Sequence, residues 1–223
     1  MQVLSRLRTH AVRICMCRIL NCRVACPLLP APIERADEMP EDSWPVTTEA
    51  RIRPLRPSDF ARVIAVIDEW WGGRAMAQML PRLFFDHFTN TSFAADRDGA
   101  PDGAPDGAPD GAPDGALAGF LVGFVSQSQP GDAYIHFVGV HPGERGHGLG
   151  RRLYGTFFDV VRARGCTRVH AVTSPVNTGS VAFHRRMGFR LEPGDAQVDG
   201  IPVATGYDGP GQDRVRFVRD LPS

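Results

Sequence analysis

The chain has no lysine: all 25 of its basic residues are arginine, and 25 acidic residues balance them. A Walker-type phosphate loop needs a lysine after its glycines, so that class of nucleotide site is excluded. The chain also lacks a run of about 18 apolar residues, the length that a membrane-spanning helix requires. We therefore expect no membrane partner. A net charge of zero gives no reason to expect nucleic acid as a partner either.

Cysteine is scarce, and four of the five cysteines lie within the first 26 residues. The remaining one, Cys166, cannot support a disulfide-rich secreted fold, and no nucleophile pattern surrounds it, so we expect a buried structural thiol. The spacing of Cys15, Cys17, Cys22 and Cys26 fits no paired Cys-x-x-Cys zinc motif, and we expect no metal site.

Residues 1–50 are expected to form a tail. We expect this tail to be disordered, or its first part to result from a start codon assigned too early, in which case Met39 is the natural start of the protein. Arginines interrupt its apolar stretches, so the apolar core of a signal peptide, roughly 7 to 15 residues long, is missing. An arginine-rich transit peptide is the alternative.

The net charge of zero is a sum of unlike parts. Residues 1–26 carry five arginines and no acidic side chain, whereas residues 27–50 and residues 96–115 each carry one arginine and six acidic side chains. The rest of the chain, where we expect the folded domain, is therefore basic, which suits an anionic ligand.

Residues 100–115 are four copies of Ala-Pro-Asp-Gly. This unit is small and turn-prone and has no apolar face, so it cannot contribute to a core. We expect a solvated hairpin loop between strands at 91–95 and 117–126. A calcium-binding repeat is disfavoured because the glycine-rich nonapeptide pattern of such sites is absent.

The remaining residues alternate between strand-like and helix-like patterns, which is typical of a mixed α/β layer fold. A helix is expected from a Ser58 cap to about Glu69, and a second one over about 74–88 with a kink or split at Pro81. The other expected strands are 51–55, 133–140, 167–173, 189–191 and 214–218, and the other expected helices are 148–164 and 177–187.

A glycine-rich loop joins the strand at 133–140 to the helix that follows it. The N–H groups that open a helix are unpaired and the helix dipole is positive there, while glycine lets a bulky anion approach the main chain. This arrangement suits a pyrophosphate, and Arg145, Arg151 and Arg152 add positive charge. A dinucleotide fingerprint needs Gly-x-Gly-x-x-Gly, which this loop does not supply.

Two motifs in order carry a family resemblance: Val140-His-Pro-x-x-Arg145-x-x-Gly148-x-Gly150, and Asn177-x-x-Ser180-x-x-Phe183-His184-x-x-x-Gly188-Phe189. With them, residues 51–223 resemble the GNAT superfamily of N-acetyltransferases. The resemblance implies a GNAT-like α/β fold with a mixed sheet, in which the parallel strands 133–140 and 167–173 splay apart around acetyl-CoA. It also implies acetyl transfer, without a metal, to a primary amine of a small molecule or peptide by direct attack.

The same resemblance leads us to expect a cytoplasmic bacterial protein, monomeric or homodimeric, whose partners are acetyl-CoA and an amine acceptor. A catalytically weak acyl-CoA-binding regulatory module on the same fold is the alternative, because fold does not fix function.

The resemblance assigns cofactor contacts residue by residue. The backbone of Val138 and Val140 is expected to bond the pantetheine arm, with Gly139 at a strand bulge. Asn177, Ser180 and Phe183 are expected on the far side of the cofactor, although Asn177 also suits a helix cap and Phe183 the core. The amides expected to hold the pyrophosphate are those of Arg145, Gly146, His147, Gly148, Leu149, Gly150 and Arg151.

Two histidines are candidate catalytic residues. His184 occupies the position where the family commonly has a tyrosine acid, and it either protonates the leaving thiolate or packs in the core. His136 is a candidate base because the arylalkylamine N-acetyltransferases, which the chain resembles here, place a histidine on this strand as the base. Alternation puts it on one strand face with Tyr134 and Val138, a face that meets either the acceptor or only the core. Deprotonation of the amine through water is the alternative.

The acceptor pocket is expected beside Trp70, Trp71 and Arg74, with Tyr207 on the opposite wall. Two adjacent tryptophans at a helix end cannot both point into one core face, so one of them is expected to line the pocket. The other interpretation is core packing plus a hinge, with Arg74 paired to Asp68 or Glu69.

Overall fold

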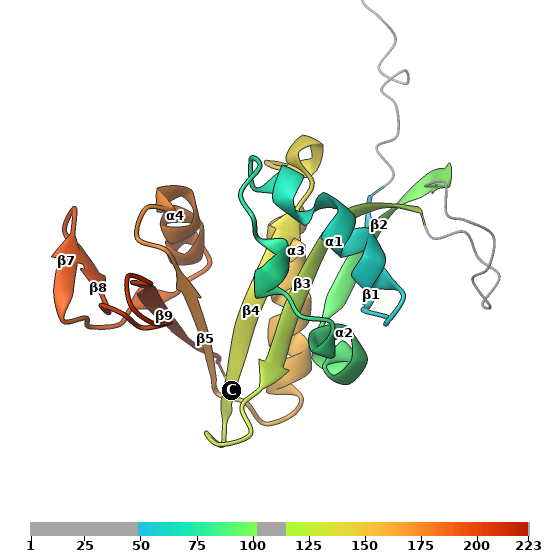
Figure 1. Ribbon diagram of the computed structural model, residues 1–223. Helices are drawn as coiled ribbons and strands as arrows, with labels where there is room; N and C mark the ends of the chain where they lie inside the picture. The colour runs from blue at the N-terminus through green and yellow to red at the C-terminus, as the bar shows by residue number, and fades with distance from the viewer. Residues whose placement is uncertain (1–48, 102–114, 223) are drawn as a thin grey trace, which may run out of the picture. The chain divides into compact units, whose positions relative to one another are not determined.

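The computed structural model describes residues 49–101 and 115–222 (Figure 1). The cysteine-containing tail and the interior of the Ala-Pro-Asp-Gly repeat lie outside the described residues. Ala50 is already part of the hydrophobic core, so the folded unit includes the two residues before the first strand. Within the described ranges, no helix is both long enough and apolar enough to cross a bilayer.

A seven-stranded mixed sheet forms the centre of the domain, in the order β1-β2-β3-β4-β5-β9-β6. β4 and β5 run parallel, and every other neighbouring pair in this sheet is antiparallel. Its strands are β1 (Arg51–Pro54), β2 (Phe93–Pro101), β3 (Gly115–Val125), β4 (Asp132–Val140), β5 (Arg168–Thr173), β6 (Arg190–Leu191) and β9 (Val215–Asp220). A separate hairpin, β7 (Ala196–Val198) and β8 (Ile201–Val203), has no counterpart in the sequence prediction.

Helices cover both faces of the sheet. They are α1 (Asp59–Trp70), α2 (Leu83–His87), α3 (Leu149–Arg162) and α4 (Thr178–Arg186). One apolar cluster joins α3 and α4 to residues such as Val169, Ala171 and Phe217, and a second joins α1 and α2 to β2, β3 and β4. On the α1 side the second cluster contains no residue of β5 or β9, so α1 and α2 leave that part of the sheet uncovered.

The parallel pair β4 and β5 separates partway along its length. Backbone pairing runs from Asp132 and Arg168 to Ile135 and Ala171 and stops there, although β4 continues to Val140. Figure 1 shows the two strands diverging beyond this point. The predicted mixed fold with a splayed central pair is confirmed.

The prediction that Tyr134, His136 and Val138 share one strand face is wrong. Val122 pairs with Phe137 and the next residue of β3 pairs with Ile135, so His136 is the extra residue of a β-bulge. The bulge reverses the alternation, and Val138 packs with the α3 cluster instead. The bulge was expected at Gly139, which serves a different purpose: a Cβ there would lie 2.5 Å from the Phe120 ring.

The helix predicted over 74–88 is split at Pro81, which is one of the two forms expected there, and its first half is not α-helical. The chain forms a short 3-10 turn at Ala77–Met79 and resumes as α2 only at Leu83, because Pro81 cannot donate a helical hydrogen bond. Ser58 precedes α1 as expected, but its side chain makes no capping bond. The carboxylate of Asp59 accepts from the Arg56 N–H at 2.8 Å instead.

The longer predicted elements agree with the structure. The helix expected at 148–164 is α3, which ends at Arg162. Gly165, expected to stop this helix, lies just beyond its end and has a left-handed φ of +82°. The helix expected at 177–187 is α4 and is followed by Gly188, with a φ of +81°. β2 and β3, which flank the repeat, pair as an antiparallel hairpin from Phe93 and Leu121 to Pro101 and Gly115.

Candidate functional site

The loop between β4 and α3 presents a row of free main-chain donors. No described residue accepts a hydrogen bond from the N–H groups of residues 146 to 151. Gly146 and Gly148 hold left-handed φ angles of +87° and +88°, and no atom lies within 4 Å of where their Cβ atoms would stand. The chain therefore needs glycine at both positions for its backbone conformation, and the space beside them is open.

The arginines of this loop have different roles. Arg145 is engaged inside the protein: its Nε donates to the Val140 carbonyl at 3.1 Å and its Nη2 to the Trp70 carbonyl at 2.6 Å. Arg152 forms an ion pair with the exposed Glu49 at 3.0 Å. Arg151 is exposed, and no hydrogen bond or ion pair joins its side chain to another described residue.

α4 lies against the first turn of α3. The Asn177 side chain accepts from the Ser180 N–H at 3.2 Å, which is the helix-capping role. A Cβ on Gly150 would stand 3.4 Å from the Phe183 ring, so these two residues pack closely. Asn177, Ser180 and Phe183 are thus brought beside the glycine loop, as expected of one site, while their contact with a cofactor stays a prediction.

His184 is buried rather than open to the loop. Its Nδ1 donates to the Ser180 carbonyl at 2.8 Å, and a carbonyl can only accept, so Nε2 must accept from the Tyr154 hydroxyl at 3.0 Å. The ring stacks on Phe217 with 4.4 Å between centroids. Burial lowers the pKa of His184, although the bond to Ser180 opposes this shift.

His136 lies on the other face of the sheet from α3. Its Nε2 donates to the Met79 carbonyl at 3.0 Å, which leaves Nδ1 with the lone pair of a neutral imidazole. The ring stacks on Phe84, with centroids 4.4 Å apart. Burial lowers the pKa of His136, opposed by the Met79 bond and by the charge of Asp208.

Both tryptophans pack on the second apolar cluster, which is the core packing that one of the two interpretations expected. Their rings lie 6.1 and 6.4 Å from Phe120, because Trp70 ends α1 and Trp71 turns away from the helical path just after it. Arg74 pairs with neither expected acid; its Nε donates to the Trp71 carbonyl at 3.2 Å. Asp68 instead accepts from the N–H groups of Met76 and Ala77.

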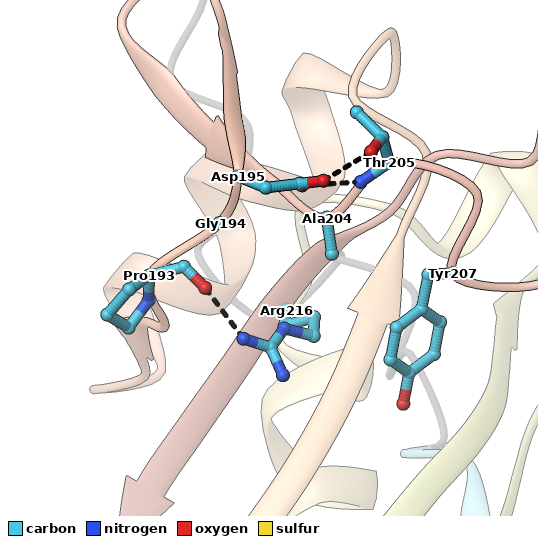
Figure 2. A pocket seen from close by; sticks show the side chains of 7 residues that line it. All are labelled: Pro193, Gly194, Asp195, Ala204, Thr205, Tyr207 and Arg216. Carbon is cyan, nitrogen blue, oxygen red and sulfur yellow. Dashed lines mark hydrogen bonds between the residues drawn. The ribbon is translucent and has the colours of Figure 1, made fainter.

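Two cavities share Tyr207 and Arg216 in their linings, and the larger one extends along the paired residues of β4 and β5 to Ala171, where their pairing ends. The smaller, of about 460 Å³, lies between the segment before β7 and the segment after β8 (Figure 2). The larger, of about 510 Å³, takes its polar lining from Ser126, Gln129, Asp132, Tyr134, Arg168, His170, Glu192, Tyr207 and Arg216.

Of the expected acceptor residues, Tyr207 lines both of these cavities, whereas Trp70, Trp71 and Arg74 line neither of the two. Sequence reasoning missed His170 of β5, Arg216 of β9 and Glu192, which follows β6; they lie far apart in the sequence and form no local motif. The alternation of β5 and β9 could have shown that His170 and Arg216 lie on the face away from α3, but not that a cavity opens there.

Comparisons with known proteins agree with this geometry. The family model described as the acetyltransferase (GNAT) family matches residues 65–189, more than half of the chain. A mycothiol acetyltransferase of Beutenbergia cavernae is 38% identical over 78 residues, which make up 35% of this chain and 25% of that protein. The match therefore spans only about a quarter of that relative's length.

Solved structures share the fold. Ard1 of Thermoplasma volcanium has a TM-score of 0.56 and 16% identity, covering 78% of this chain and 99% of that one. YncA of Salmonella typhimurium, solved with its cofactor acetyl-CoA, has a TM-score of 0.51 and 17% identity, covering 78% and 95%. At these identities the likeness shows the fold alone. The family match, the splayed strand pair and the glycine loop lead to one conclusion: the chain belongs to the GNAT family of acetyltransferases.

Proposed function

We propose that the protein is an acetyl-CoA-dependent N-acetyltransferase that acts on a primary amine of a small molecule or peptide by direct attack. The observation that carries this proposal is the row of free N–H groups at residues 146–151, placed where β4 ends and α3 begins. Six adjacent donors at the positive end of a 14-residue helix form a site for a diphosphate.

The residues present fit acetyl-CoA. The glycine-loop N–H groups would hold its pyrophosphate, with the exposed Arg151 beside them. Beyond Ile135 and Ala171, neither β4 nor β5 has the other as a partner, so the pantetheine arm can pair with β4 at Val138 and Val140. Asn177, Ser180 and Phe183 would border the cofactor from α4.

Acetyl-CoA supplies an acetyl group activated as a thioester. The lone pair of the neutral amine forms the new C–N bond, the C–S bond breaks, the nitrogen gives up a proton and the thiolate gains one. A GNAT site therefore needs a proton acceptor for the amine and a proton source for the sulfur. No covalent bond to the protein is required.

His136 is the acceptor of the amine proton in this proposal. The Met79 carbonyl fixes its Nε2–H, so the free lone pair is on Nδ1, and its lowered pKa keeps the ring neutral near pH 7. Replacing His136 with alanine should remove the acidic limb of the kcat/KM profile against pH. An unchanged limb would assign the deprotonation to water.

Of the two roles expected for His184, the geometry supports packing. Its only N–H is donated to the Ser180 carbonyl and its other ring nitrogen accepts from Tyr154, so no proton is available for the sulfur. His184→Phe should therefore impair folding and acetyl-CoA binding together. A selective loss of turnover with intact acetyl-CoA affinity would restore the acid role.

The test of the proposed function is thiol release from acetyl-CoA across a panel of primary amines, together with calorimetric binding of acetyl-CoA. Release that depends on an amine supports the enzyme. Tight acetyl-CoA binding without release on any amine would favour the alternative of a regulatory acyl-CoA-binding module, to which the occupied nitrogens of His184 lend weight. Gly148→Ala is the matched variant that should weaken binding in either case.

A further inference from the structure

The larger cavity lies on the face of the sheet opposite α3 and α4. Val169, Ala171 and Phe217 of β5 and β9 point into the α3 cluster, so the alternating residues His170 and Arg216 point the other way. Helices α1 and α2 leave this part of the sheet uncovered. The cavity therefore opens beside the β4–β5 gap, on the side from which an acceptor can meet a thioester inserted from the α3 side.

Arg216 brings a positive charge to this cavity that is not neutralised by an ion pair. Its Nη2 donates to the Pro193 carbonyl at 2.6 Å, and no described residue accepts from its Nε or Nη1 (Figure 2). Asp195 lies near enough to feel the charge, but its carboxylate oxygens accept from the N–H and hydroxyl of Thr205. The Nε–H is itself buried from solvent, so Nη1 is the unpaired group that the guanidinium can offer to an anion at the cavity wall.

Glu192 brings the opposite charge to the same cavity. Its backbone N–H donates to the Arg216 carbonyl at 2.9 Å, yet no ion pair joins the two side chains. Among the described residues, the one basic side chain within 4.0 Å of the Glu192 carboxylate is the His170 ring, at 3.9 Å. The other cavity carboxylate, Asp132, is already held by Arg168 at 2.8 Å and by His170 at 3.1 Å.

The cavity thus offers one anion-binding and one cation-binding group on neighbouring strands, with the phenols of Tyr134 and Tyr207 beside them. Its volume of about 510 Å³ suits a compact molecule. An acceptor with only an amine would leave Arg216 unpaired in the complex, which costs binding energy.

We propose that this cavity selects an acceptor of the amino-acid type, with its carboxylate on Arg216 and its ammonium group drawn in by Glu192. The inference rests on the proposed acetyl transfer and names the substrate class for that site. The planar guanidinium matches a carboxylate, and Tyr207 closes the wall that Arg216 shares with the smaller cavity.

The test compares amines that differ only in the carboxylate. Thiol release from acetyl-CoA is measured with L-ornithine against putrescine and with L-lysine against cadaverine. We expect kcat/KM to be about 10- to 100-fold higher for the amino acid of each pair, the range that a hydrogen bond to a charged group supports. Arg216→Gln should abolish this preference, and Arg190→Gln, which changes an exposed arginine on the adjacent strand β6, should keep it.

Glu192→Gln provides a second variant on the same wall. This substitution should lower kcat/KM for the amino acid and for the matching diamine by the same factor, because both carry the ammonium group. The preference for the amino acid should therefore remain. Acetyl-CoA affinity and the melting temperature of each variant show whether it folds. Equal rates for amino acid and diamine, or a preference that survives Arg216→Gln, would overturn this inference alone. Absence of thiol release with every amine would instead overturn the proposed function.

Discussion

The hydroxyl of Tyr154 donates a hydrogen bond to Nε2 of His184 across 3.0 Å and so ties α3 to α4 inside the core. Both residues are buried, and Phe189 packs edge-on against each ring. Burial raises the pKa of Tyr154 well above its ordinary value, so the phenol remains a donor throughout the physiological range. The helix that carries the glycine loop is thereby fixed to the helix that carries Asn177 and Phe183.

Removing the Tyr154 hydroxyl should lower the stability of the protein and have little effect on its activity. Tyr154→Phe keeps the ring but leaves Nε2 of His184 buried without a partner, which lowers the free energy of unfolding by about 1 to 3 kcal/mol. Urea denaturation measures this loss. We expect the kcat pH profile to be unchanged, since His184 is not the acid in our proposal. A displaced basic limb in Tyr154→Phe would contradict that assignment.

Stability should fall on the acid side of neutrality. The folded pKa values of His184 and His136 lie below the ordinary 6.5, because burial disfavours the charged ring. Below pH 6.5 the unfolded chain therefore binds protons that the folded chain does not, and the unfolding free energy drops by up to about 1.4 kcal/mol per pH unit for each histidine.

Denaturant unfolding between pH 7.5 and 5.5 measures that slope. His184→Gln should remove the contribution of His184 to this slope, and His136→Gln should remove that of His136. Each substitution should do so whatever its effect on the unfolding free energy at pH 7.5. A slope that neither variant reduces would show that other groups set the acid-side stability.

The glycine loop should tolerate no side chain at position 148. Gly148→Ala places a Cβ in open space but on a φ of +88°, so we expect strain of about 1 to 2 kcal/mol and roughly tenfold weaker acetyl-CoA binding. Gly155→Ala is the matched control, because it lies mid-helix in α3, with nothing within 4 Å of the new Cβ and no positive φ. Calorimetry should find the control's affinity unchanged and its stability equal or higher.

A buried ion pair fixes β1 to α1. Arg53 contacts both carboxylate oxygens of the fully buried Asp59, at 2.7 and 2.8 Å. Burial alone would raise the pKa of Asp59, but the bond and charge of Arg53 and the Arg56 N–H bring it below its ordinary value. Asp96, at 2.7 Å from Arg53, would remain as its second carboxylate partner, so Asp59→Asn removes part of a buried charge network and should cost about 3 kcal/mol.

The control for this substitution is Asp159→Asn, which breaks an exposed pair with Arg162. That change should cost at most about 1 kcal/mol, because water screens the pair. Both values come from urea denaturation at pH 7. Equal effects of the two substitutions would mean that the Asp59 pair is no more important than a surface one.

The sequence was sufficient to predict those elements whose boundaries are set by neighbouring residues along the chain. Gly148 and Asn177 stand between a strand and a helix, and each determines its own turn, so α3, α4 and the glycine loop could be predicted with small boundary errors. Tertiary packing overrode the pattern elsewhere. The strand face of His136 depends on a bulge created by pairing with β3, and the role of His184 depends on Tyr154, 30 residues earlier.

The two glycine-containing motifs and the order of elements are properties of the sequence. They were sufficient to predict the family, which the family model confirms, and they led us to propose acetyl-CoA as the cofactor. The acceptor side was decided by the fold. His170, Glu192 and Arg216 meet because β5, β9 and the segment that follows β6 are neighbours, and because, within the described part of the chain, the cluster of α1 and α2 does not extend over β5 or β9. A cavity is a property of surfaces brought together, and no single stretch of sequence carries it.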